Sequence, residues 1–177
     1  MPAMTEPREL FLHELGDILY AENVQVKALP KLAREAKDEA LRDGFQEHLQ
    51  ETKEQIKNIK EVFKGIGEKA SAEKCPGIDG INSEHDMFMS EHDASPEICD
   101  LFLAGAGARA EHYEIAAYSG LVAMARAMGE KDAASLLEEN LRQEKATLRK
   151  LETATRRLAK SAKTANGGTS SKKSSKR

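Results

Sequence analysis

Residues 12–29 read LHELGDILYAENVQVKAL, and their apolar side chains recur in steps of three and four. This spacing places them along one face of an α-helix. The seam consists of Leu12, Leu15, Leu19, Glu22, Val26 and Leu29. Glu22 thus stands where an apolar residue belongs, and a buried charge is costly unless it is paired or bound to a metal. The segment therefore predicts a helix that buries a polar group.

The same interrupted pattern occurs in residues 104–122 and 137–151. The two seams are Ala104, Ala108, Glu111, Ile115, Tyr118, Val122 and Leu137, Leu141, Glu144, Leu148, Leu151. Glu22, Glu111 and Glu144 each lie within about one turn of the midpoint of the predicted helix, so packing would bring them to one level. Like charges gathered there need cations or protons. A dinuclear Fe or Mn site with oxygen ligands and some imidazole is the usual solution.

The region 38–66 allows two readings of its apolar seam. One reading is Leu41, Phe45, His48, Thr52, Gln55, Ile59; the other is Phe45, Leu49, Thr52, Ile56, Ile59, Phe63. Periodicity favours His48 as a ligand. The carboxylate of Glu51 suits a site with oxygen ligands, and the match of Gln50-Glu51 to Gln143-Glu144 also favours Glu51. Both are kept as candidates, and Glu114 joins them because residues at i and i+3 can reach one metal centre together.

Four long helices and one long connection are predicted. The helices cover about 7–37, 38–66, 96–128 and 131–160, and a short helix is expected near 78–89. The connection between the first two long helices and that between the last two are short, so each pair should form an antiparallel hairpin. The 27-residue link 68–94 is long enough to cross the whole length of a bundle. The predicted fold class is therefore all-α, a ferritin-like four-helix bundle of two antiparallel hairpins joined by a long crossover.

Composition and charge limit which other classes of protein the chain could belong to. No apolar run is long enough to span a membrane, and two cysteines make no disulfide framework, so a cytoplasmic location is expected. The net charge is −3, but residues 160–177 contain six basic residues and no acid, which leaves −9 on the first 159. We expect a helical domain over 1–160 and a disordered Ser/Lys tail over 161–177. Nucleic-acid binding is not expected beyond a weak contact through this tail.

The chain resembles the YciE/YciF family of bacterial stress-associated ferritin-like proteins, which are similar to rubrerythrin in fold. The resemblance covers about residues 8–160. It is carried by LYAENVQVKALPKLA (19–33), HLQETKEQIKNIKEVF (48–63), KCPGIDGI (74–81), AEHYEIAAYSGL (110–121) and QEKATLRKL (143–151). The resemblance implies a rubrerythrin-like bundle that forms a homodimer and is expressed under stress.

Rubrerythrin-like sites use the pattern E-x-x-E in the third helix, which Glu111 and Glu114 match. They use E-x-x-H in the second and fourth helices. Here the second helix has the reversed order His48-x-x-Glu51, and Thr147 stands where the histidine of the fourth helix would be.

The resulting hypothesis is a di-iron or di-manganese protein of the stress response that reacts with peroxide or oxygen. Its metal ligands would be Glu22, His48, Glu51, Glu111, Glu114 and Glu144. The metal would be the electron carrier, since no protein nucleophile or flavin motif is present. Whether the chain is an enzyme, a di-metal peroxidase or oxidase, stays open. The alternative is a non-catalytic helical stress or assembly protein with a degenerate metal site. A storage or DNA-protecting cage is the third hypothesis.

Overall fold

The computed structural model of the chain describes residues 4–170, with the backbone alone for 164–170. The secondary structure of this part is five α-helices, without a strand. The helices are α1 (Pro7–Glu35), α2 (Glu39–Gly65), α3 (Pro76–Glu91), α4 (Pro96–Ala127) and α5 (Lys131–Ser170). The prediction of an all-helical chain is confirmed. Across this part of the chain, no helix is long and apolar enough to cross a membrane.

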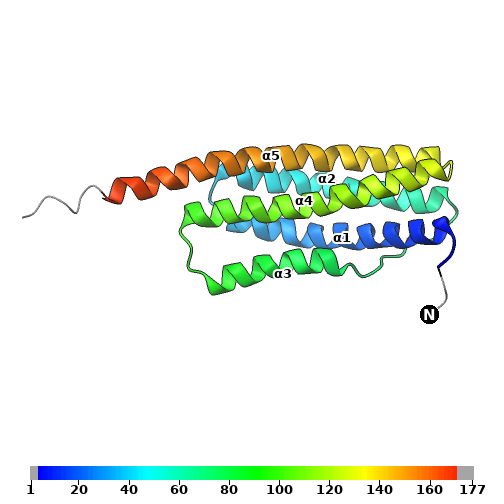
Figure 1. Cartoon of the computed structure of the whole chain (residues 1–177), viewed down its shortest axis with the longest axis horizontal. Helices are drawn as coiled ribbons and strands as arrows, with labels where there is room; N and C mark the ends of the chain where they lie inside the picture. Colours follow the sequence, from blue (N-terminus) through cyan, green and yellow to red (C-terminus); the bar gives the residue numbers. More distant parts are fainter. Residues whose placement is uncertain (1–3, 171–177) are drawn as a thin grey trace, which may run out of the picture.

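The four long helices lie side by side, and α3 runs along the outside (Figure 1). Helices α1 and α2 pack together, as do α4 and α5, and further contacts join α2 to α5 and α1 to α4. Helix α3 packs against α1 and α4. The segment between α2 and α3 crosses α1 at Gly16, where the backbone N–H of Glu73 donates to the Gly16 carbonyl at 3.0 Å. A Cβ at Gly16 would lie 2.9 Å from the backbone carbonyl oxygen of Ser71, so only glycine permits this close crossing.

The helix ends follow local chemistry. Gly67 and Gly129 adopt positive φ angles of 79° and 81°, a conformation that glycine enters without steric cost. In each case the next residue donates back to the last turn, from Glu68 to Phe63 and from Glu130 to Ala125. Helix α1 continues through Pro30, which lies inside the range 7–37 expected for the first helix.

Helix α5 is longer than expected, because it runs to Ser170 rather than ending at Lys160. The added segment, residues 161–170, contains no proline but includes Asn166, Gly167 and Gly168, residues of low helix propensity, so the sequence favoured an earlier end of the helix than the structure shows. The last predicted tail residues, 171–177, lie outside the described residues. The division of the chain into a domain and a tail at residue 160 stays a prediction.

The turn between α1 and α2 is held against the other hairpin. The buried carboxylate of Asp100 on α4 accepts hydrogen bonds from the backbone N–H groups of Lys37 (2.7 Å) and Asp38 (2.8 Å). Asp38 in turn caps α2 and binds both terminal nitrogens of Arg157 on α5. These contacts join the α1–α2 turn to α4 and α5.

The apolar core consists of two clusters. One contains Phe11, Leu15, Ile18, Ile59, Phe63, Leu121 and Leu137 among others. The second contains Leu29, Leu32, Leu41, Phe45, Leu103, Leu151 and Leu158 among others. In each long helix the residues of one cluster precede the polar turn and those of the other follow it, except Ala110, which directly precedes Glu111 on α4. The buried polar groups therefore lie between two apolar layers at mid-depth.

Candidate metal centre

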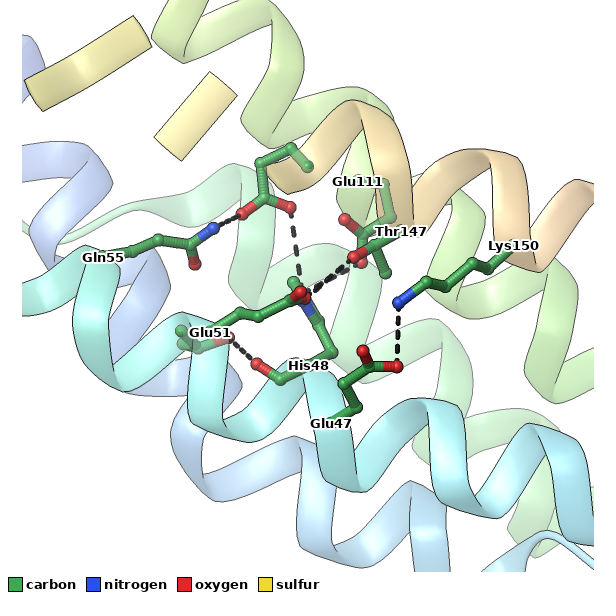
Figure 2. A network of polar contacts seen from close by, with 9 residues as sticks. Glu47, His48, Glu51, Gln55, Glu111, Thr147 and Lys150 are labelled. Atoms are coloured by element: carbon green, nitrogen blue, oxygen red, sulfur yellow. Dashed lines mark hydrogen bonds and ion pairs between the residues drawn. The ribbon is translucent and has the colours of Figure 1, made fainter. Parts of the chain in front are cut away.

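Each long helix contributes one polar turn to the centre of the molecule. Glu22 comes from α1, His48 and Glu51 from α2, Glu111 and Glu114 from α4, and Glu144 from α5. Their exposed fractions are 1% for Glu22, 2% for His48 and Glu111, and 0% for Glu114 and Glu144. Glu51 lies at the margin, with 25% of its side chain exposed. Figure 2 shows His48, Glu51, Glu111 and Thr147 converging from three helices.

His48 is at the centre of the measured contacts. Its Nε2 lies 3.2 Å from Glu111 Oε1 and 3.8 Å from Glu144 Oε2, and its Nδ1 lies 3.2 Å from Glu51 Oε2. One ligand atom from each of His48, Glu111, Glu114 and Glu144 lies within 4.8 Å of the others. Among the described residues these four could hold a metal ion.

Glu22 and Glu51 flank this group of four. The hydroxyl of Tyr118 donates to Glu22 Oε1, and the negative charge of Glu22 acts on Glu114. Glu51 approaches from the other side through His48 and through Thr147 Oγ1, which donates to it at 3.2 Å. The structure thus brings all six predicted residues to one region, four of them in a compact group and two beside it.

The first reading of the α2 seam describes the inward face. Leu41, Phe45, His48, Thr52, Gln55 and Ile59 are all buried. Of the residues that belong only to the second reading, Ile56 and Phe63 are buried as well, whereas Leu49 is partly exposed. His48 therefore points to the interior, and Glu51, one turn further on, reaches the same region from the edge.

Burial sets the protonation of the carboxyl groups. It raises the pKa of Glu114 and Glu144 well above the ordinary value, and the neighbouring carboxylates raise both further. Burial also raises the pKa of Glu22 to about 8, although the hydrogen bond from Tyr118 opposes this shift.

Glu111 and His48 form the charged pair of the site. Burial alone would raise the pKa of Glu111, but the charge of His48 and hydrogen bonds from Glu144 and His48 outweigh it, and this pKa falls. Burial likewise opposes the charged form of His48, yet the charge of Glu111 and the hydrogen bonds of Glu111 and Glu51 raise the pKa of His48 well above its ordinary value.

Several buried acceptors at the centre have no hydrogen-bond partner. They are Glu111 Oε2, both oxygens of Glu114, Glu144 Oε2 and Gln55 Oε1. Each such group costs about 1–3 kcal/mol when it is left unsatisfied. The carboxylate oxygens and the imidazole are donors that suit Fe or Mn, and a cation would satisfy the orphaned oxygens. The residues present therefore fit a metal.

The residues that hold the candidate ligands were not predicted from the sequence. Gln55 Nε2 donates to Glu144 Oε1. Asn140 donates to the Tyr118 hydroxyl at 3.1 Å and to the Gln55 backbone carbonyl at 3.2 Å. Thr147 stands where rubrerythrin-like sites have a histidine, and its Oγ1 lies 3.3 Å from His48 Nδ1. The available signal was a polar residue one turn from a candidate ligand: Gln55 follows Glu51 by four residues, and Asn140 and Thr147 stand four before and three after Glu144.

Fold and site together define a class: an all-helical protein whose long helices enclose a buried group of carboxylates and one histidine that could hold a metal ion. Residues 6–164 match the family described as "Domain of unknown function (DUF892)". The chain belongs to this family.

Known relatives share both sequence and fold. Protein YciF of Escherichia coli (strain K12) is 37% identical over 140 residues, which is 78% of this chain and 84% of the relative. The crystal structure of the E. coli stress protein YciF superposes with a TM-score of 0.84 at 35% identity, covering 89% of this chain and 99% of that one. YcfI of Rhodopseudomonas palustris gives 0.82 at 40% identity, covering 84% and 94%.

A protein of Xanthomonas campestris pv. campestris superposes with a TM-score of 0.71 at 20% identity, covering 92% of this chain and 99% of that chain. At this identity the likeness concerns the fold alone.

Proposed function

We propose that the chain is a ferritin-like four-helix bundle with a dinuclear Fe or Mn site of the stress response. The two pairs α1–α2 and α4–α5, each joined by a short turn, support the bundle of two hairpins. The segment with α3 joins the second helix of one pair to the first helix of the other, and Figure 1 shows it passing along the outside of the molecule. Such connectivity is typical of ferritin-like proteins.

The observation that carries the proposal is the group of orphaned carboxylate oxygens around His48. Glu111, Glu114 and Glu144 each have at least one buried oxygen without a partner, and His48 joins them within one ligand shell. Like charges at this density are tolerated only with cations or protons. Glu22 and Glu51 would bind from the two flanks, so that six side chains serve two metal ions.

The metal would supply one-electron redox chemistry toward peroxide or oxygen. The protein's own residues prepare the site for it. Gln55 orients Glu144, and Tyr118, itself held by Asn140, orients Glu22. The two apolar clusters exclude water from both ends of the site. Because YciF is described as a stress protein, we place this chemistry in stress defence, in a cytoplasmic homodimer.

One observation favours the non-catalytic alternative. The raised pKa values of Glu114 and Glu144 allow these groups to stay neutral without a metal. In a helical stress or assembly protein with a degenerate site, protons would neutralise these carboxyl groups, and the same residues would be buried. The two functions therefore differ in metal content rather than in fold.

Metal analysis distinguishes them. Protein expressed with Fe or Mn supplements and purified without a chelator should contain close to two metal ions per chain. Its melting temperature should fall when a chelator removes them, because a ligand that binds only the folded state stabilises it. Protein with far less than one ion per chain under both supplements, and with a melting temperature insensitive to either metal, would establish the non-catalytic alternative.

A further inference from the structure

A groove lies between α1 and α2, beside the turn that joins them. Its lining comes from residues 29–37 and 42–49, and its volume is about 440 Å³, which falls in the range of small-molecule sites in proteins. None of the six candidate metal ligands lines it. The groove is therefore a feature separate from the metal centre.

Most of the groove is apolar, because six of its ten lining residues are hydrophobic. Leu29, Ala33 and Phe45 are at most 6% exposed and belong to the second apolar cluster of the core. Pro30 and Leu49 are partly exposed. A molecule in the groove would thus cover apolar side chains of both helices, which favours an alkyl chain as the occupant.

The charged residues of the lining are all basic, namely Arg34, Lys37 and Arg42. Within the described part of the chain, none of the three forms a salt bridge with a carboxylate. The charge of Arg42 acts on Asp38, but that carboxylate is already bound by Arg157. Three cations without an anionic partner therefore gather around an apolar groove on an otherwise acidic domain.

The helix ends explain only part of this charge. Cations near the C-terminus of α1, such as Arg34 and Lys37, interact favourably with the helix dipole. Arg42 is the fourth residue of α2, where the dipole disfavours a cation. Its Nη2 nevertheless has a fixed place, because it donates to the backbone carbonyls of Ala36 and Lys37, each at 3.3 Å. A guanidinium has further N–H donors with which to bind an anion.

The backbone of the turn is not available for a phosphate group. The N–H groups of Lys37 and Asp38 donate to the carboxylate of Asp100 at 2.7 and 2.8 Å, and that of Leu41 donates to Asp38 at 2.9 Å. Phosphate sites at helix N-termini depend on free N–H groups of this kind. Recognition of an anion therefore depends on the basic side chains, and arginine pairs with a carboxylate through two parallel hydrogen bonds.

We propose that this groove binds a free medium-chain fatty acid. The carboxylate lies among Arg34, Lys37 and Arg42, and the alkyl chain covers the apolar lining at Leu29 and Phe45. The binding is reversible and involves no covalent step. The inference concerns a second site and does not depend on the proposed metal site.

Isothermal titration calorimetry of the metal-free full chain with decanoate, below its micelle concentration, tests the class of ligand. Decanoate should bind saturably at a single site per chain. Butyrate keeps the carboxylate but has a short chain, and decyltrimethylammonium keeps the chain but reverses the charge. Each should bind about tenfold more weakly than decanoate or worse, since each lacks one half of the recognised chemistry.

A charge test locates the site. Arg34 and Lys37 are exposed, so the double variant Arg34→Gln with Lys37→Gln should fold like the wild type and bind decanoate about tenfold more weakly. The matched control is Lys53→Gln with Lys60→Gln, which removes two exposed charges of α2 outside the lining. This control should bind decanoate as the wild type does.

A second test concerns the alkyl chain. Leu49→Glu places a carboxylate in the apolar lining and should abolish decanoate binding, because the chain would have to bury a charge. Leu10→Glu is the control, since Leu10 is 43% exposed on α1 and lies outside the groove. Circular dichroism checks that each variant is folded, and the charge test stands if Leu49→Glu is not.

Several results would overturn the proposal. These are the absence of saturable decanoate binding, equal binding of decyltrimethylammonium, or equal effects of the two double variants. Binding of phosphatidylglycerol vesicles or polyglutamate by protein that does not bind decanoate would also overturn it, and would assign the groove to a membrane surface or an acidic peptide. Because the protein is metal-free throughout, none of these results bears on the metal site.

Discussion

Replacement of Glu114 by leucine should have opposite effects on the metal-free and the metal-loaded protein. Glu114 is 0% exposed, and neither of its oxygens has a hydrogen-bond partner. Leucine has a similar size and helix propensity, so Glu114→Leu removes the unsatisfied acceptors with little other change. Because an unsatisfied buried group costs about 1–3 kcal/mol, the metal-free variant should be more stable than the wild type by about this amount.

The expected change is large enough for calorimetry. For a chain of this size each kcal/mol shifts the melting temperature by about 2–4 °C, so metal-free Glu114→Leu should melt roughly 2–12 °C above the wild type. With Mn(II) at a hundred times the dissociation constant, the wild type should gain about 2.7 kcal/mol. The variant should gain much less, because it lacks a candidate ligand.

The control is Glu54→Leu, an exposed glutamate of α2 whose side chain is 60% exposed. A surface substitution of this kind should change stability by about 0.5 kcal/mol or less and leave the Mn(II) effect intact. A metal-free Glu114→Leu that melts below the wild type would refute the unsatisfied-acceptor argument. An undiminished Mn(II) shift in this variant would remove Glu114 from the ligands.

Three further substitutions test the surroundings of the site. Burial raises the pKa of Glu22 from 4.5 to about 8, so its contribution to metal-free stability is complete below about pH 4.5 and is lost as the pH rises through 8. The melting temperature of Glu22→Gln should therefore depend less on pH than that of the wild type. The same pH dependence in both proteins would contradict this. Tyr118→Phe leaves Glu22 without its hydrogen-bond donor and removes an acceptor of Asn140. Urea unfolding should show that the free energy of unfolding falls by about 1–3 kcal/mol. An unchanged urea midpoint would contradict this expectation. Asp100→Ala removes the acceptor of two backbone N–H groups in the α1–α2 turn and should cost about 2–4 kcal/mol. Asp100→Asn keeps one acceptor oxygen and should lose less, and equal losses in the two variants would contradict this expectation.

The helices were predictable because their determinants are local. Apolar spacing fixed the α-helical period of the four long segments, and Pro7, Pro96, Gly67 and Gly129 marked their ends. The extension of α5 to Ser170 was missed, since residues 161–170 include Asn166, Gly167 and Gly168, whose low helix propensity favours an earlier end.

The buried glutamates were also visible in the sequence. Glu22, Glu111 and Glu144 interrupt apolar seams, and a charge in such a position is exceptional enough to indicate a site. All three are buried at the same level of the molecule. Their role as metal ligands stays a prediction until metal binding is measured.

Only the tertiary structure decided how these residues meet. Two seams were open for α2, and the choice between them depended on how the helix is rotated about its axis against α1 and α5. That rotation places His48 inside and Glu51 at the edge, and it brings Gln55 to Glu144 across 89 positions of sequence. The sequence by itself determined which residues are helical and which turns carry charge, because those depend on neighbours within a few positions. Side-chain partners on different helices depend on the rotation and height of each helix, which the packing of the whole core fixes.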